Sequence, residues 1–214
     1  MSATAPLRIG VLDIQGDVLE HVIMMDEVLV KRNIASETVV VKHPEQIDML
    51  DGLIIPGGES TVMSRFISEK RFGAKLASKI REKAKNGMAI FGTCAGAILL
   101  SKASKDHIVE GFEQSLLELM DIKIIRNRYG RQQESFEQSI KITEWNEDPF
   151  PGVFIRAPVI IKAKKNVKVL ARNDSQIFAA QQNNCLAVTF HPELTDDTRF
   201  HEYFLELILE NRKD

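Results

Sequence analysis

The chain has 214 residues, a hydrophobic share of 44% and a formal net charge of −2. This length suits one large domain or two small ones, and the apolar share is enough for a substantial core. A nearly neutral chain lacks the basic field that attracts nucleic acid. No apolar run approaches the roughly 20 residues that span a membrane, and the N-terminus lacks a signal-peptide pattern. We therefore expect a cytoplasmic protein that binds neither nucleic acid nor membrane.

Strand and helix patterns alternate along the first half of the sequence. Strands are predicted over residues 8–14, 37–41, 53–55 and 88–91, and helices over residues 17–32, 61–67, 74–86 and 95–101. On the first helix, one predicted face carries Val18, Val22, Met25 and Leu29. Alternation of this kind is typical of βαβ units and predicts a parallel sheet.

The second half is richer in strands. Short strand patterns cover residues 121–126, 135–142, 153–155, 167–171, 176–180 and 186–190, and a helix over residues 197–211 follows. Few helices separate these strands, which favours an antiparallel extension of the sheet. We predict an α/β fold in three layers, with a mostly parallel central sheet flanked by helices. The absence of a linker predicts a single domain over residues 1–214, with an ordered core at about 7–211.

The segment from residue 88 to residue 100 is the most informative. A buried strand pattern leads into Gly92-Thr93-Cys94-Ala95-Gly96, and a helix pattern follows. This order is that of a nucleophile elbow with cysteine in the place of serine, in which glycines relieve crowding. The helix N-terminus favours a thiolate, and the N–H of Ala95 can stabilise an oxyanion. The alternative, a small buried hydrophobic cysteine, is the common role of a free cysteine, but the glycine pair favours the nucleophile.

A thiol nucleophile needs a base and a group that orients the base. His191 follows the strand pattern at residues 186–190, and Glu193 lies two residues further on. The carboxyl edge of a parallel sheet is where α/β folds place their sites. We therefore expect Glu193 to hold the His191 imidazole. The alternative is a histidine that only ends a strand.

The remaining histidines and the second cysteine have no such setting. His21 is expected at the surface or facing a partner, and His43 in a loop. His107 and His201 show no partner pattern, and Cys185 is predicted to be a buried, inert strand residue. Because no histidine–cysteine cluster has the spacing of metal ligands, we predict no metal site.

A glycine pair follows the strand pattern at residues 53–55, within Pro56-Gly57-Gly58-Glu59-Ser60-Thr61. The segment lacks the spacing and the lysine of a phosphate loop. Gly57 and Gly58 suit the second half of an oxyanion hole and a small polar substrate. The alternative is a tight turn with Ser60 or Thr61 as the N-cap of the next helix, and both interpretations can hold together.

Two arginines, Arg126 and Arg156, end strand patterns. A guanidinium group binds carboxylates with two parallel hydrogen bonds, so one of these residues is a candidate for the α-carboxylate of an amino acid. For either arginine alone, a surface position is the simpler interpretation.

Together these residues resemble the class I, triad-type glutamine amidotransferases, in which the histidine and the glutamate lie close together near the C-terminus. Further segments are similar to the glutaminase subunits of pyridoxal 5′-phosphate synthase. They are residues 10–17, 56–61, 92–96, 126–132 with 135–137, and 154–158. The resemblance runs from about residue 8 to the final helix, and the 126–132 and 154–158 segments are the most specific.

The resemblance implies a class I glutamine amidotransferase-like fold, with Cys94, His191 and Glu193 in catalysis and no cofactor. The positions matching the family's glutamine-binding residues are Gly58, Glu59, Ser60, Arg126, Ile155 and Arg156. The implied partner is a (β/α)8-barrel synthase subunit that uses the ammonia to make pyridoxal 5′-phosphate. Two departures from the family are Asp13, where a small or apolar residue is usual, and a longer stretch around residues 101–119.

The segment Gln15-Gly16-Asp17 follows the first strand, so its loop is expected at the same sheet edge as Cys94. The Gln15 amide is able to hydrogen-bond to the Gly57–Gly58 backbone. We hypothesise that docking of the synthase orders this loop and completes the oxyanion hole. The alternative is that Gln15 only caps the first helix.

Three other functions compete with this interpretation. The first is the glutaminase subunit of another amidotransferase. A cysteine-elbow α/β hydrolase is a second alternative, although such folds place the acid before the histidine in the chain. A catalytically inactive binding protein with the same fold is the third, and the intact triad argues against it.

Overall fold

The computed structural model describes residues 6–70, 72–107, 109, 111, 113–127, 135–143, 145, 148–174 and 176–212. Among these residues, no helix is long and apolar enough to cross a membrane. Part of the family-like segment at 126–132, namely residues 128–132, lies outside the described residues.

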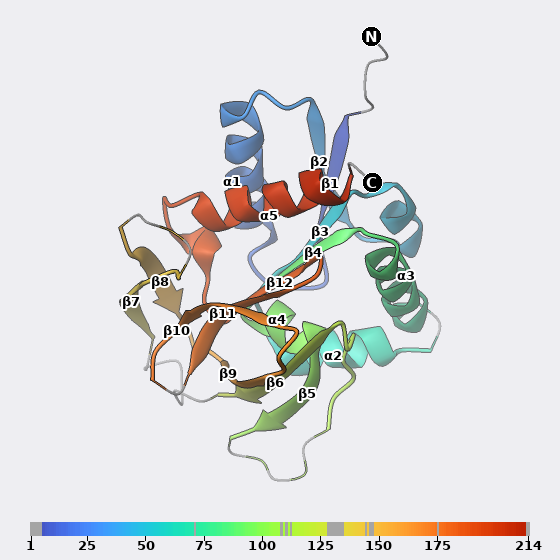
Figure 1. Cartoon of the computed structure of the whole chain (residues 1–214). Helices are drawn as coiled ribbons and strands as arrows, with labels where there is room; N and C mark the ends of the chain where they lie inside the picture. Colours follow the sequence, from blue (N-terminus) through green and yellow to red (C-terminus); the bar gives the residue numbers. More distant parts are fainter. Residues whose placement is uncertain are drawn as a thin grey trace.

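The first half of the chain forms the parallel part of the central sheet (Figure 1). Its strands are β1 (Leu7–Leu12), β2 (Ser36–Val41), β3 (Gly52–Ile55) and β4 (Ala89–Thr93). They lie side by side in the order β2-β1-β3-β4, and every neighbouring pair is parallel. A strand from the end of the chain, β12 (Cys185–Val188), continues this order beside β4, also in parallel. The predicted parallel sheet is confirmed.

Antiparallel strands extend the sheet beyond β12. They are β11 (Ile177–Gln182), β9 (Val159–Ala163), β6 (Met120–Arg126) and β10 (Lys168–Arg172), with β10 paired to β11. A separate antiparallel pair consists of β7 (Phe136–Ile140) and β8 (Phe150–Phe154). The antiparallel extension is confirmed.

Two strands depart from the predicted elements. The helix expected to reach residue 101 ends at Leu100, and Ser101–Asp106 forms β5, which pairs in parallel with β6. Polar residues dominate this edge strand, so its sequence carries little strand signal. Strand β9 was also not predicted.

Helices cover both faces of the parallel strands. On one face lie α1 (Val18–Lys31) and α5 (Arg199–Asn211), and on the other lie α2 (Ser60–Ser68), α3 (Gly73–Lys85) and α4 (Ala95–Leu100) (Figure 1). Two connections contain short 3-10 helices: η1 (Pro44–Met49) lies between β2 and β3, and η3 (Pro192–Leu194) lies between β12 and α5. The three-layer arrangement follows the prediction.

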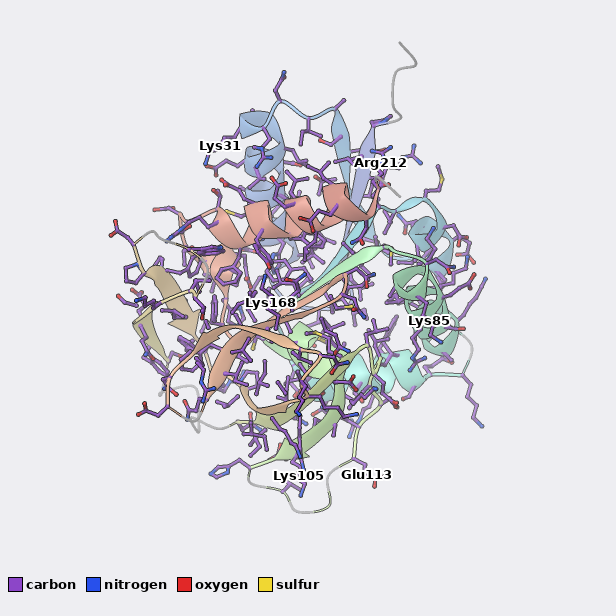
Figure 2. All side chains as sticks on the ribbon, viewed as in Figure 1. Lys31, Lys85, Lys105, Glu113, Lys168 and Arg212 are labelled. Carbon is purple, nitrogen blue, oxygen red and sulfur yellow. The ribbon has the colours of Figure 1, made fainter. Side chains whose placement is uncertain are left out.

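Each helical layer packs its own hydrophobic core against the sheet. Along β4, Phe91 joins the core beneath α1 and α5, and Ile90 joins the core beneath α2, α3 and α4. This assignment follows from the alternation of side chains along a strand. Side chains fill the space between the layers, and the exposed Lys85 and Lys105 point outward (Figure 2).

The buried face of α1 differs from the predicted face. Its buried residues are His21, Met24, Met25, Val28 and Leu29. Val18 and Val22, expected on this face, are only partly buried against the core. The difference places a histidine in the interior directly beneath the elbow strand β4.

Candidate active site

Cys94 lies between β4 and α4 in a strained backbone conformation. Its φ and ψ are +46° and −103°, in a region that residues with a side chain rarely adopt. The Cys94 N–H donates to the carbonyl of Val188 on β12 at 2.9 Å, which ties the turn to the neighbouring strand. The residue is 6% exposed. Because Ala95 is the first residue of α4, its N–H has no acceptor within the helix and is available to an oxyanion.

The glycines on either side of Cys94 permit close packing of backbone on backbone. A Cβ atom on Gly96 would lie 1.9 Å from the carbonyl oxygen of Ile55, and one on Gly92 would lie 2.7 Å from the carbonyl carbon of Gly96. The expected crowding is therefore present, but the positive φ belongs to Cys94 itself.

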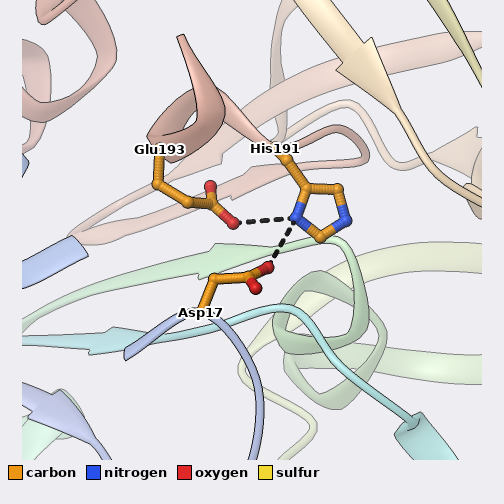
Figure 3. A group of neighbouring side chains, drawn as sticks. All are labelled: Asp17, His191 and Glu193. Carbon is orange, nitrogen blue, oxygen red and sulfur yellow. Dashed lines mark hydrogen bonds and ion pairs between the residues drawn. The ribbon is translucent and has the colours of Figure 1, made fainter. Parts of the chain in front are cut away.

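His191 and Glu193 form a buried hydrogen-bonded pair just beyond β12. The distance from His191 Nδ1 to Glu193 Oε1 is 2.8 Å (Figure 3). Burial alone lowers the pKa of His191, but the charge of the Cys94 thiolate and the carboxylates of Asp17 and Glu193 outweigh burial and raise it. Burial raises the pKa of Glu193, while its contact with His191 opposes the change. The arrangement favours the protonated form of the His191 imidazole.

A second carboxylate, that of Asp17, contacts the same nitrogen of His191. Asp17 Oδ2 lies 3.2 Å from His191 Nδ1 (Figure 3). The hydrogen bond to His191 lowers the pKa of Asp17, against the effect of its partial burial. Sequence reasoning placed residues 15–17 at this edge but gave Asp17 no role. The available signal was an acidic residue in a loop that was expected at the same sheet edge as Cys94.

The ligand atoms of Asp17, His191 and Glu193 all lie within 4.8 Å of one another, a spacing that would also suit a metal ion. Here the Nδ1 atom of His191 faces both carboxylates and is the site of their hydrogen bonds. The N–H at Nδ1 of His191 is therefore placed to donate to either carboxylate.

Two more histidines lie buried behind Glu193. His21 Nδ1 is 2.9 Å from His201 Nε2, and His21 Nε2 is 3.1 Å from Thr93 Oγ1. His21 Nε2 also lies 3.4 Å from Glu193 Oε2. The prediction of a surface position for His21 was wrong. Its two ring nitrogens contact polar side chains inside the protein, so the ring can lie on the buried face of α1. Burial lowers the pKa of His21 well below its usual value and that of His201 to about 3, so both are neutral near pH 7.

The glycine loop after β3 packs directly against the proposed base. A Cβ atom on Gly57 would lie 2.5 Å from Cε1 of His191 and 3.4 Å from Cβ of Cys94. The 15–17 loop lies on this glycine loop in turn, since a Cβ atom on Gly16 would lie 1.9 Å from the carbonyl oxygen of Gly57. Gln15 Oε1 is buried and finds no hydrogen-bond partner among the residues that the structure describes. In the described part of the chain, the suggested Gln15 bond to the glycine backbone is thus not formed by this oxygen.

A cleft of about 250 Å³ opens at this edge of the sheet. Its lining includes every residue predicted for the site except Gly57 and Glu193. The lining also includes Asp17, Ile98 and Asn127, which were not predicted. Small-molecule sites of drug size are usually about 300–1,000 Å³, so this cleft suits a small metabolite.

Arg126 reaches the cleft from β6 and is held by several acceptors. Its guanidinium donates to Glu59 Oε1 at 3.2 Å, to Thr61 Oγ1 at 3.0 Å and to Gln114 Oε1 at 3.3 Å. Asp106 lies 3.8 Å from its Nε atom. The stretch at 101–119, for which the sequence predicted no structure, thus contributes two side chains that contact Arg126, those of Gln114 and Asp106.

Glu59 caps helix α2. Its carboxylate accepts hydrogen bonds from the N–H groups of Thr61 and Val62, both at 3.1 Å. The prediction of Ser60 or Thr61 as the N-cap was therefore wrong by one or two residues, because a glutamate reaches the same N–H groups from one position earlier. Arg156 is exposed in the loop after β8 with φ +44°, and it also lines the cleft.

Comparisons with known proteins agree with this geometry. A model of the SNO glutamine amidotransferase family matches residues 11–210. A protein named pyridoxal 5′-phosphate synthase subunit PdxT, from Thermotoga petrophila, is 49% identical over 94% of this chain and 100% of its own length. Its namesake from Methanosarcina barkeri is 45% identical over 96% and 100%. A crystal structure described as a glutamine amidotransferase is 40% identical, covers 94% of this chain and 98% of its own, and has a TM-score of 0.77.

Proposed function

Because the chain belongs to the SNO glutamine amidotransferase family, we infer that it is the glutaminase subunit of a pyridoxal 5′-phosphate synthase. It hydrolyses glutamine to glutamate and ammonia, and the ammonia feeds vitamin B6 synthesis. The observation that supports a catalytic role for this cleft is the His191–Glu193 hydrogen bond of 2.8 Å beside a cysteine in an elbow conformation.

In the first half of the proposed reaction, the Cys94 thiolate attacks the side-chain amide carbon of glutamine. A carbon–sulfur bond forms, and the carbonyl oxygen becomes an oxyanion. The N–H of Ala95 and the Gly57–Gly58 loop stabilise this charge. The protonated His191 then gives its proton to the amide nitrogen, and ammonia leaves as the thioester forms.

In the second half, neutral His191 removes a proton from water, which attacks the thioester carbon. A second oxyanion forms at the same place and collapses, the carbon–sulfur bond breaks, and glutamate leaves. Glu193 keeps the proton of the neutral ring on Nδ1 and stabilises the imidazolium whenever it forms.

Arg126 or Arg156 is proposed to bind the α-carboxylate of glutamine, and Glu59 or the nearby backbone to receive its amino group. Glu59 remains 40% exposed in its side chain although it caps α2, so it has acceptor capacity left for a ligand. The remaining glutamine-binding positions in this proposal are Gly58, Ser60 and Ile155, all at the cleft.

We further propose that a (β/α)8-barrel synthase subunit receives the ammonia. Gln15 is the candidate for coupling its docking to the oxyanion hole, because the 15–17 loop lies on the Gly57 carbonyl. A single domain and a cytoplasmic location stay predictions of the sequence.

The test measures ammonia release from glutamine, with and without the synthase subunit. A glutamine-mimicking electrophile is expected to label Cys94, and Cys94→Ala should abolish release while leaving the fold intact. Cys185 serves as the internal control, because burial raises the pKa of its thiol to about 12. Labelling of Cys185 with Cys94 untouched, or full activity in Cys94→Ala, would refute the assignment.

The coupling hypothesis has its own test. Wild type and Gln15→Ala are compared with and without the synthase subunit. One oxyanion donor is worth about 2.7–4 kcal/mol, so activation is expected to reach roughly 100- to 1,000-fold. A free subunit as fast as the complex would remove the gating hypothesis, and an unaffected Gln15→Ala complex would remove Gln15 from it.

A further inference from the structure

The two buried histidines behind Glu193 have no part in the mechanism above. His21 and His201 are fully buried, and they come from α1 and α5 on the face of the sheet opposite α4. Four side chains meet there: His201, His21, Thr93 and Glu193. Thr93 directly precedes the nucleophile, and Glu193 holds the base. These four side chains therefore connect the turn that carries Cys94 with the carboxylate that contacts His191.

The hydrogen-bond partners determine which nitrogen of each ring carries the proton. His201 Nδ1 is buried and has no hydrogen-bond partner among the described residues, and buried N–H groups without an acceptor are rarer than unpaired acceptors. The proton of His201 therefore belongs on Nε2, which donates to His21 Nδ1 at 2.9 Å. A neutral His21 then carries its own proton on Nε2.

This proton lies between two acceptors. His21 Nε2 is 3.1 Å from Thr93 Oγ1 and 3.4 Å from Glu193 Oε2. The second distance is long, and Glu193 Oε2 has no hydrogen-bond partner in the described part of the chain. The opposite tautomer would direct a lone pair at this buried carboxylate oxygen and leave the His201 N–H unpaired, so two costs exclude it.

We propose that His21 is a positioning residue of the glutaminase, which uses its Nε2–H to fix Thr93 and the Glu193 carboxylate. The inference rests on the proposed triad. His201 sets the tautomer, His21 directs its N–H toward Glu193 Oε2, and Glu193 Oε1 is thereby left to His191. With His191 bonded to Oε1 and the His21 N–H directed at Oε2 from 3.4 Å, the carboxylate of Glu193 keeps its plane when the ring of His191 changes charge during turnover.

The experiment uses the complex of this chain with the synthase subunit. His21→Phe keeps an aromatic ring but has no donor, whereas His21→Gln places an amide N–H near the former Nε2. We expect His21→Phe to lower kcat about 10-fold with little change in KM for glutamine, because the contact acts on the base and not on the substrate. His21→Gln should recover most of this loss. His107→Gln, at an exposed histidine, is the matched control.

Thermal melting and nitrogen NMR of the wild-type imidazoles complete the test. A native melting curve with unchanged kcat in His21→Phe overturns the proposal, and so does a His21→Gln variant that folds but is as slow as His21→Phe. If His21→Phe fails to fold, NMR decides. A neutral His21 with its proton on Nε2 between pH 6 and 8 supports the proposal, and a proton on Nδ1 overturns it. A wild-type complex no more active than Cys94→Ala would instead refute the proposed function.

Discussion

Replacement of Asp17 by asparagine removes the second carboxylate from His191 and leaves the shape of the loop nearly unchanged. Two unit charges 3.2 Å apart, in an effective dielectric of about 20, interact by about 5 kcal/mol. The Asp17 side chain is 36% exposed, so water screens much of this interaction. We therefore expect Asp17→Asn to remove about 1–2 kcal/mol of stabilisation from the His191 imidazolium, which corresponds to a fall of about one unit in the pKa of His191.

The direction of the change follows from the charges. Asp17 stabilises the imidazolium and so raises the pKa of His191. In Asp17→Asn this pKa falls, and His191 loses its proton at a lower pH. Since protonated His191 is proposed to release ammonia, the alkaline limb of the kcat/KM profile should move about one unit toward acid. Activity near neutral pH should change much less than activity at the alkaline end.

The assay is ammonia release from glutamine across the pH range, in the presence of the synthase subunit. Asp13→Asn is the matched control, because Asp13 lies in the same part of the chain, is 34% exposed in its side chain and pairs with Lys42 at 3.3 Å instead of with His191. An alkaline limb that stays in place in Asp17→Asn, or that moves equally in Asp13→Asn, would refute the electrostatic role of Asp17.

Three further changes are expected to have distinct effects. Gly16→Ala forces a side chain into φ +99° and against the Gly57 carbonyl, so ammonia release should fall at least about 10-fold, with a backbone strain of about 1–3 kcal/mol visible as a lower Tm. Arg126→Ala should raise KM for glutamine roughly 10- to 150-fold, the range for a lost hydrogen bond to a charged group, and unchanged glutamine kinetics would remove it from the site. Hydrogen bonds, first of all from Asn166, lower the pKa of Asp121, so its stabilising contribution is complete above about pH 4 and is lost as the pH falls. Asp121→Asn should accordingly lower Tm at pH 7 and differ less from wild type near pH 3, and an equal difference at both pH values would contradict this linkage.

The parallel half of the fold was predictable because its signals are local and repeated. Residues 53–55 and 88–91 are buried on both faces and followed by glycine-containing turns, and such runs are read directly as central strands. The strained turn at Cys94 and the His191–Glu193 hydrogen bond were predictable for the same reason. A glycine pair around a cysteine and a glutamate two residues after a histidine are short-range patterns.

The contacts that were missed depend on partners far away in the sequence. Nothing local to His21 shows that His201, 180 residues away, supplies its hydrogen bond, so a histidine on a helix was placed at the surface. Asp17 becomes part of the site only because β1 and β12 end at the same edge of the sheet. The edge strand β5 pairs on one side alone and is rich in polar residues, so neither alternation nor apolar runs predicted it.

The contact between Gly57 and His191 limits how this sequence can vary. With the imidazole in place, even a methyl group at position 57 would lie 2.5 Å from Cε1 of the ring. A smaller residue at 191 would make room for that methyl group, but it would also remove the proposed base. Position 57 therefore cannot change independently of position 191. Nor can a larger residue at one position be compensated by a smaller residue at the other, as often happens between neighbouring core residues. A saturation library at position 57, selected for growth without added vitamin B6, is expected to return glycine.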